Sequence, residues 1–174
     1  MGILPLSNRQ AYRGMTLIEF LIIIGIMAIT AVASVSSFTS IVRNYRISGV
    51  AEQLYYQLQY ARSEAVKRNA TVYVSFSTGD SWCYGINVGG TCDCTTAGSC
   101  GLATTSASAP GLISLSTSGM TGNSINFEGT HGAANASGSV TLTLFGQTSL
   151  ITLSISRFGN LQLCSTGISG YTAC

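Results

Sequence analysis

The fold is decided by residues 13–69, which read RGMTLIEFLIIIGIMAITAVASVSSFTSIVRNYRISGVAEQLYYQLQYARSEAVKRN. No proline occurs between Thr16 and Asn69, so nothing in this stretch forces a helix to end. We therefore predict one long helix from Met15 to Arg68 that is apolar in its first half and amphipathic in its second.

The first half of this helix, residues 15–42, carries a single charged side chain, Glu19. A helix of about 20 apolar residues crosses a bilayer core about 30 Å thick, so this half is expected to span a membrane. A carboxylate inside a membrane costs about 2.5 kcal/mol or more unless it finds a partner. Glu19 is therefore expected either to contact another chain or to reach the headgroups near the helix start.

The second half, residues 43–69, shows a helical spacing of apolar residues at intervals of three and four. The members of this stripe are Ile47, Val50, Leu54, Leu58, Ala61 and Ala65. Polar residues fall on the other faces, so the stripe needs a partner that the rest of the chain must supply. Asn69 is expected to follow the last helical residue.

The remainder, residues 70–174, has the alternation and the turn residues of short strands. The expected strands are 71–77, 82–88, 112–116, 124–128, 139–145, 150–156 and 161–164, with a loop over 89–110 and a hairpin turn at 146–148. Antiparallel strands packed on one amphipathic helix predict an α+β fold with a small β domain.

Charge and composition exclude several classes of function. Only 8% of the 174 residues are charged, and the formal net charge is +2. The single histidine, His131, lies in a turn-like sequence, and no carboxylate pair, coupled nucleophile or phosphate-binding glycine loop is recognisable. We expect neither an enzyme nor a cofactor.

All six cysteines follow the helix, which is typical of a domain exported to an oxidising compartment. Cys164 and Cys174 are expected to pair and to close the carboxyl-terminal tail onto the last strand. Two local bridges are expected among the other four, with the pairing left open: Cys83, Cys92, Cys94 and Cys100. Their spacing is a poor match to a zinc site, so no metal is expected.

Residues 13–19, RGMTLIE, resemble the processing site of the type IV pilin superfamily. The resemblance implies that a prepilin peptidase cuts after Gly14, that the new amino terminus at Met15 is N-methylated, and that Glu19 pairs with the terminal amine of a neighbouring subunit. An ammonium and a carboxylate that meet in lipid relieve each other's desolvation. Two positions depart from the family pattern: Met15, where phenylalanine is commoner, and Ser36, where many major pilins have proline.

The resemblance also implies where each segment of the chain lies before and after assembly. Residues 1–14 would be a cytoplasmic leader, residues 15–42 would cross the inner membrane and later join a filament core, and residues 70–174 would form a periplasmic domain. The implied partners are the prepilin peptidase, the inner membrane before assembly, and other minor and major pilins in the pilus.

Four further segments narrow the resemblance to the GspH/FimT/FimU group of minor pilins and pseudopilins. They are 54–76, 82–86, 125–127 and 157–161. The group implies a minor pilin that supports pilus assembly in a tip or priming complex. The cysteines favour the pilus members, and a GspH pseudopilin of type II secretion is the alternative.

A second hypothesis is DNA binding in natural transformation. FimT-type relatives are implied to bind double-stranded DNA through a GRxR motif near the carboxyl terminus. Here the corresponding place is residues 156–160, SRFGN, where Arg157 matches and the second arginine is missing. Arg62, Lys67 and Arg68 add positive charge, although cations at a helix carboxyl end are also an ordinary solvated face.

Overall fold

The computed structural model describes residues 14–108, 110–146 and 150–174, with side chains for all of these except residues 32–37. The expected leader up to Arg13 and most of the expected turn at 146–148 lie outside the described residues. The chain divides into two compact units, Met1–Ile41 and Val42–Cys174.

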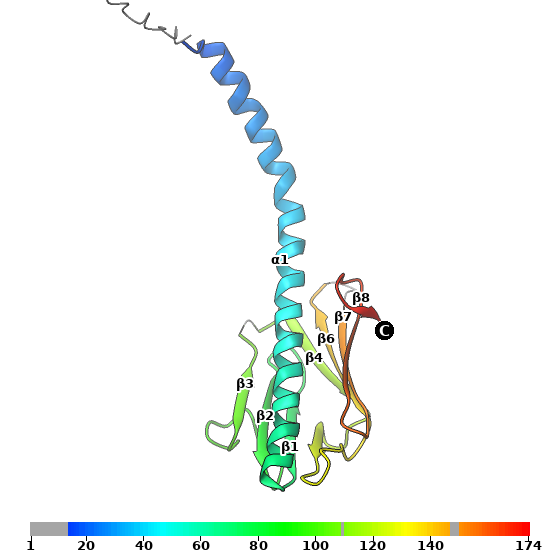
Figure 1. Ribbon diagram of the computed structural model, residues 1–174. Helices are drawn as coiled ribbons and strands as arrows, with labels where there is room; N and C mark the ends of the chain where they lie inside the picture. Colours follow the sequence, from blue (N-terminus) through cyan, green and yellow to red (C-terminus); the bar gives the residue numbers. More distant parts are fainter. Residues whose placement is uncertain (1–13, 109, 147–149) are drawn as a thin grey trace, which may run out of the picture. The chain divides into compact units, whose positions relative to one another are not determined.

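Helix α1 (Leu17–Arg68) begins in the first unit and ends in the second (Figure 1). Thr16 stands just before it, and its Oγ1 accepts a hydrogen bond of 3.3 Å from the Glu19 amide. This is the pattern of an N-cap followed by an acid three residues later. At the other end, Asn69 adopts a left-handed φ of 48° and the Ala70 amide bonds to the Ala65 carbonyl, so the helix ends as expected.

The described part of α1 in the first unit is apolar and exposed. Except for Ile23, which is half-buried, its large apolar side chains are each at least 47% exposed: Leu17, Ile18, Phe20, Leu21, Ile22, Ile24, Ile26, Met27, Ile29, Phe38 and Ile41. Among the described residues, no helix has a stretch long and apolar enough to cross a membrane. The membrane-spanning role expected of residues 15–42 stays a prediction.

In the second unit, two sheets pack with the helix around one core (Figure 1). The first has the order β3 (Ala103–Ser106), β2 (Cys83–Val88), β1 (Val72–Ser77), β5 (Ser124–Phe127). The second has the order β4 (Ile113–Ser118), β6 (Gly138–Leu144), β7 (Leu150–Ile155), β8 (Leu161–Thr166), β9 (Thr172–Ala173). All pairings are antiparallel except that of β8 with β9. The α+β fold is confirmed.

The core is centred on the helix stripe. Six side chains along α1 are at most 1% exposed: Ile47, Ala51, Leu54, Leu58, Ala61 and Ala65. The expected stripe differs at one place, because Val50 is half-buried and Ala51 takes the buried position. The observed intervals of four, three, four, three and four residues have the same mean as the expected ones, 3.6 residues, so both positions are compatible with the helical period and the packing of the core selects Ala51.

Two strands were missed by the sequence analysis. The expected loop 89–110 contains β3, which pairs with β2 at the edge of the first sheet. Its sequence, ATTS, has no large apolar side chain, so its alternation carries no hydrophobic signal. The short strand β9 is missed for a different reason: its only partner is β8, and the Cys164–Cys174 disulfide brings the two together.

The other two disulfides hold the loop 89–101 over the outer face of the first sheet. Cys83 pairs with Cys94, and Cys92 pairs with Cys100. The Asn87 side chain bonds to the Gly90 carbonyl at 3.1 Å and to the Gly101 amide at 3.2 Å. Cys83 lies on β2 and the other three cysteines lie in this loop. The pairing of the four, which their spacing left open, is therefore decided by which loop cysteine lies beside Cys83.

We expect Gly85→Ala to impair closure of the Cys92–Cys100 bridge. A Cβ at Gly85 would clash with the Cys100 Sγ and would lie 2.8 Å from the Cys92 Sγ. Thiol titration of the purified, unfolded protein should therefore find free thiols in this variant and none in the parent.

Gly90→Ala is the matched control, since a Cβ there would meet nothing within 4 Å. Full oxidation of Gly85→Ala, with an unchanged melting temperature, would contradict the packing described for this loop.

Candidate functional site

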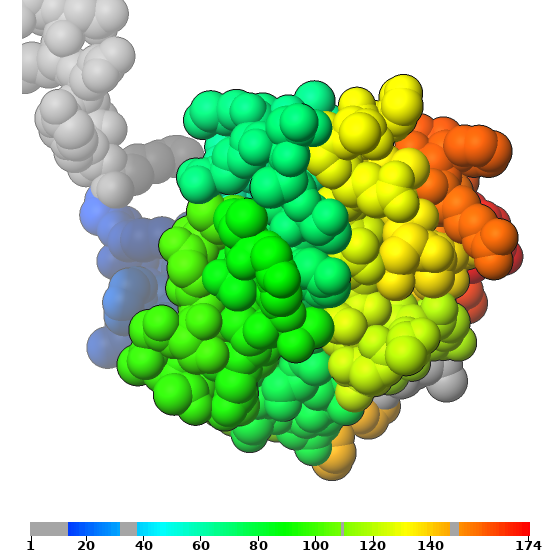
Figure 2. All heavy atoms as spheres, turned by 90° about the horizontal axis from the view of Figure 1, so that it is seen from below, coloured from blue at the N-terminus to red at the C-terminus, as the bar shows by residue number. Residues whose placement is uncertain are grey.

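Three segments meet at one end of the second unit: the carboxyl end of α1, the turn after β5, and the turn between β7 and β8. The Ala134 amide bonds to the Arg157 carbonyl at 3.0 Å, which joins the two turns. Figure 2 views this end and shows the helix end in turquoise, the turn after β5 in yellow and the β7–β8 turn in orange. All four cations proposed from sequence for DNA binding come from these segments.

Arg62 joins the helix to both turns. Its Nε donates to the Gly132 carbonyl at 3.0 Å, and its second terminal nitrogen donates to the Phe158 carbonyl at 3.3 Å. Gly132 and Gly159 have left-handed φ values of 65° and 75°, and a Cβ on either would press against the Arg62 side chain. The guanidinium is therefore held in a structural contact, which the sequence analysis did not foresee.

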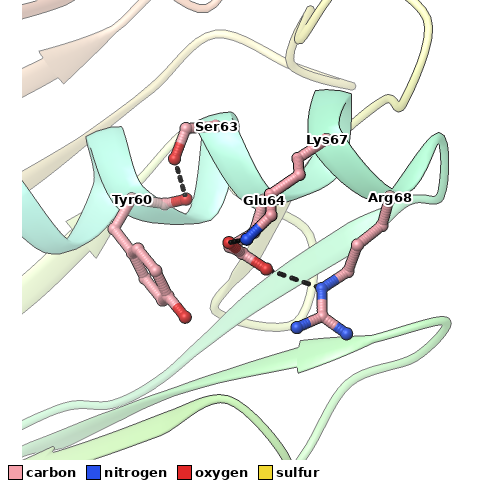
Figure 3. Close-up of polar contacts among 5 residues, drawn as sticks. All are labelled: Tyr60, Ser63, Glu64, Lys67 and Arg68. Carbon is pink, nitrogen blue, oxygen red and sulfur yellow. Dashed lines mark hydrogen bonds and ion pairs between the residues drawn. The ribbon is translucent and has the colours of Figure 1, made fainter.

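Lys67 and Arg68 share one carboxylate, that of Glu64 (Figure 3). The distances are 3.2 Å from the Lys67 Nζ and 2.6 Å from the Arg68 Nε. The Glu64 side chain is only 7% exposed, whereas its partners reach into solvent. The pKa of the Glu64 carboxyl is lowered from its ordinary value of 4.5, first by the hydrogen bond from Arg68 and then by that from Lys67.

Arg157 differs from the other three cations. Its side chain is exposed, and no described residue accepts a hydrogen bond from its guanidinium. The neighbouring Phe158 is 80% exposed, so a cation and an aromatic ring stand together in solvent. His131 is also exposed and lines a hollow of about 470 Å³ with Arg62, Lys67 and neighbouring helix residues.

The residues expected to take part in processing lie together at the start of α1. Gly14 and Met15 precede the helix in a segment without regular structure, and Met15 is 62% exposed. Glu19 lies in the first helical turn, where a carboxylate interacts favourably with the helix dipole. The structure thus leaves Gly14 and Met15 exposed and places the Glu19 carboxylate in the first turn of the helix.

No group of three or more His, Cys, Asp or Glu side chains that could hold a metal ion occurs in the described part of the chain. The four cysteines that crowd together in sequence are all joined in disulfides.

Comparison with known proteins identifies the family through a family model. The family model described as type II transport protein GspH matches residues 50–159. Among solved structures, the type IV minor pilin FimU of Pseudomonas aeruginosa is similar, with 22% identity, a TM-score of 0.49, and coverage of 67% of this chain and 90% of that chain. The sequences of curated proteins give no match.

We expect Glu64→Gln to lower the melting temperature at pH 7. The folded-state pKa of Glu64 is depressed, so its ion pairs stabilise the protein above pH 4.5, and this contribution is lost as the pH falls through the folded-state pKa. The difference from the parent should therefore shrink below pH 4.5 when both are followed by circular dichroism.

Glu128→Gln serves as the control, because it removes the same charge from an exposed side chain. A difference between Glu64→Gln and the parent that does not change with pH would contradict the ion-pair account.

Proposed function

Since the chain belongs to the family of type II transport protein GspH, we propose that it is a minor pilin that supports the assembly of a type IV pilus. In this proposal the chain is a structural subunit without enzymatic activity, and its partners are other pilins. Pilin-type proteins are held in a membrane before they join a filament, and we propose the same course for this chain.

The observation that carries the proposal is the apolar surface of α1 in the first unit. Successive residues of a helix point about 100° apart, so the exposed Phe20, Leu21 and Ile22 alone occupy most of its circumference. A helix that is apolar all round is normally buried in a protein or a membrane. Neighbouring helices in a filament core, and lipid before assembly, would both cover it.

The proposed assembly step depends on Glu19. Hydrolysis of the Gly14–Met15 bond would free an α-amino group at Met15, four residues before Glu19, and methylation would leave that group basic. In an apolar filament core, the Glu19 carboxylate of one subunit and the ammonium of the next would neutralise each other. Three disulfides support an oxidising compartment for the second unit, and we propose the periplasm.

A second candidate is a pseudopilin of a type II secretion machine, which the description of the matching family favours. The chemistry of processing and of Glu19 would be the same in both. The two candidates differ in the subunits that would lie next to this chain. Cross-linking would distinguish them, because a minor pilin would be linked to pilins and a pseudopilin to subunits of the secretion machine.

A third candidate, DNA binding, is supported by the exposed pair of Arg157 and Phe158. Of the four cations proposed from sequence, Arg62 is tied to backbone carbonyls, and Lys67 and Arg68 share Glu64. Arg157 is the one whose guanidinium has no partner among the described residues, so a phosphate contact would depend mainly on it.

We expect Glu19→Val to leave the protein processed and in the membrane but to reduce its recovery in sheared filaments at least tenfold. Losing one partner of a buried ion pair costs about 3–5 kcal/mol, which corresponds to more than tenfold. Mass spectrometry of the exported parent should find Met15 as the amino terminus.

Asp80→Asn, which removes an exposed carboxylate from the second unit, should leave recovery unchanged. Normal recovery of Glu19→Val in filaments would rule out the assembly role of this carboxylate, and an intact leader would rule out processing at Gly14.

For DNA, we expect a gel shift of duplex DNA by the full chain that weakens steeply with salt and is reduced in Arg157→Ala. Arg43→Ala, an exposed arginine of α1, is the control for a general loss of charge. An equal loss in both variants, or no shift at low salt, would remove this candidate.

A further inference from the structure

The second sheet has an outer face that none of the proposed functions uses. Along β4, β6 and β7, alternate residues such as Leu115, Leu142 and Leu153 are at most 2% exposed and point into the core. The residues between them point away from the core. Nearly all of these outward residues are serines and threonines, with no ionisable side chain among those described on the four strands β4, β6, β7 and β8.

The hydroxyl groups stand in rows, because residues directly opposite each other in neighbouring strands carry the same chemistry. One row crosses four strands in register: Ser118, Ser139, Ser154 and Gln162. In the next row, the Thr141 and Thr152 hydroxyls lie 3.3 Å apart. Neighbouring strands are about 4.8 Å apart, so the first row presents polar groups over about 14 Å, whereas the row of Thr141 and Thr152 ends at the disulfide-bonded Cys164.

The four residues of the first row line a hollow of about 660 Å³ at the end of the sheet. Asn160 and Gln162 supply planar amides at its wall, and the ring of Phe158 borders it. Phe158 is 80% exposed, although an aromatic ring of this size is normally packed. Arg157 does not line the hollow.

We propose that this surface binds an uncharged polysaccharide strand. Serine hydroxyls and side-chain amides each donate and accept hydrogen bonds, as do the hydroxyl groups of a sugar. The Phe158 ring offers a flat apolar platform for the C–H face of one sugar ring. The rows of hydroxyls would receive the hydroxyl edges of the sugars that follow.

The same observations disfavour other occupants. An acidic polymer or a nucleic acid is held by cations, and none lines the hollow. A protein partner would need an apolar centre in the interface, whereas this face offers one ring among hydroxyls. The proposal does not depend on assembly into a filament, so it can be tested on the isolated chain.

The test is isothermal titration calorimetry of the full chain in a zwitterionic detergent that contains no sugar. The neutral probes are cellohexaose and maltohexaose, and the charged probes are polygalacturonate and duplex DNA. We expect at least one neutral probe to bind with a Kd of about 1 mM or tighter.

Phe158→Ala should weaken this binding about tenfold, the loss expected when one aromatic contact is removed. Phe145→Ala is the matched control, since Phe145 is 76% exposed on a different turn, and its loss should change nothing. Gln162→Ala, an exposed change on β8, should also weaken binding and provides a second test should Phe158→Ala melt at a lower temperature.

Three results would overturn the proposal. They are the absence of binding to both neutral probes, an equal effect of Phe158→Ala and Phe145→Ala, and binding of polygalacturonate or DNA that is tighter than that of the neutral probes and is weakened by Gln162→Ala, a change within the hollow.

Discussion

The second unit depends on the burial of one helix stripe. Side chains of α1 from Ile47 to Ala65 recur at the helical period and are at most 1% exposed. Fully burying a side chain such as Leu54 or Leu58 contributes about 1.5–3 kcal/mol. Both sheets need this stripe, because each has one apolar face and the helix shares a core with both. Without the helix, two small sheets would be left with only each other to cover their apolar faces.

Disulfides and hydrogen bonds hold the loop 89–101, which lies outside the hydrophobic core. The loop 89–101 has few apolar residues and is held by two disulfides and by the Asn87 side chain. The pKa of Asp93 within it is lowered by hydrogen bonds from the Thr95 side chain and amide and from the Thr96 side chain. A loop of this composition has little hydrophobic reason to be ordered, and the bridges reduce the freedom it would have when unfolded.

The second unit has few charged side chains, and several of them are bonded to groups close by. The positive residues near the end of α1 suggest a basic surface when they are counted along the sequence. In the structure, Lys67 and Arg68 share the single negative charge of Glu64 and Arg62 is bonded to two turns, which leaves Arg157 as the one of these four cations without a partner among the described residues. Two different surfaces are therefore proposed as binding sites near this end. The exposed Arg157 is the candidate for DNA, and the uncharged hydroxyl face beside it is the candidate for a polysaccharide.

The sequence alone determined the helix, most strands, the α+β class and the family, because each depends on local periodicity or on a short contiguous motif. Asn69 could be named as the helix stop since its left-handed conformation is a local property. Only the tertiary structure decided the pairing of Cys83 with Cys94, the edge strand β3, the contacts of Arg62 with Gly132 and Phe158, and the hydroxyl rows on the second sheet. These features join residues that are distant in sequence or lack a hydrophobic pattern, so strand register and turn packing, which periodicity does not encode, are what bring them together.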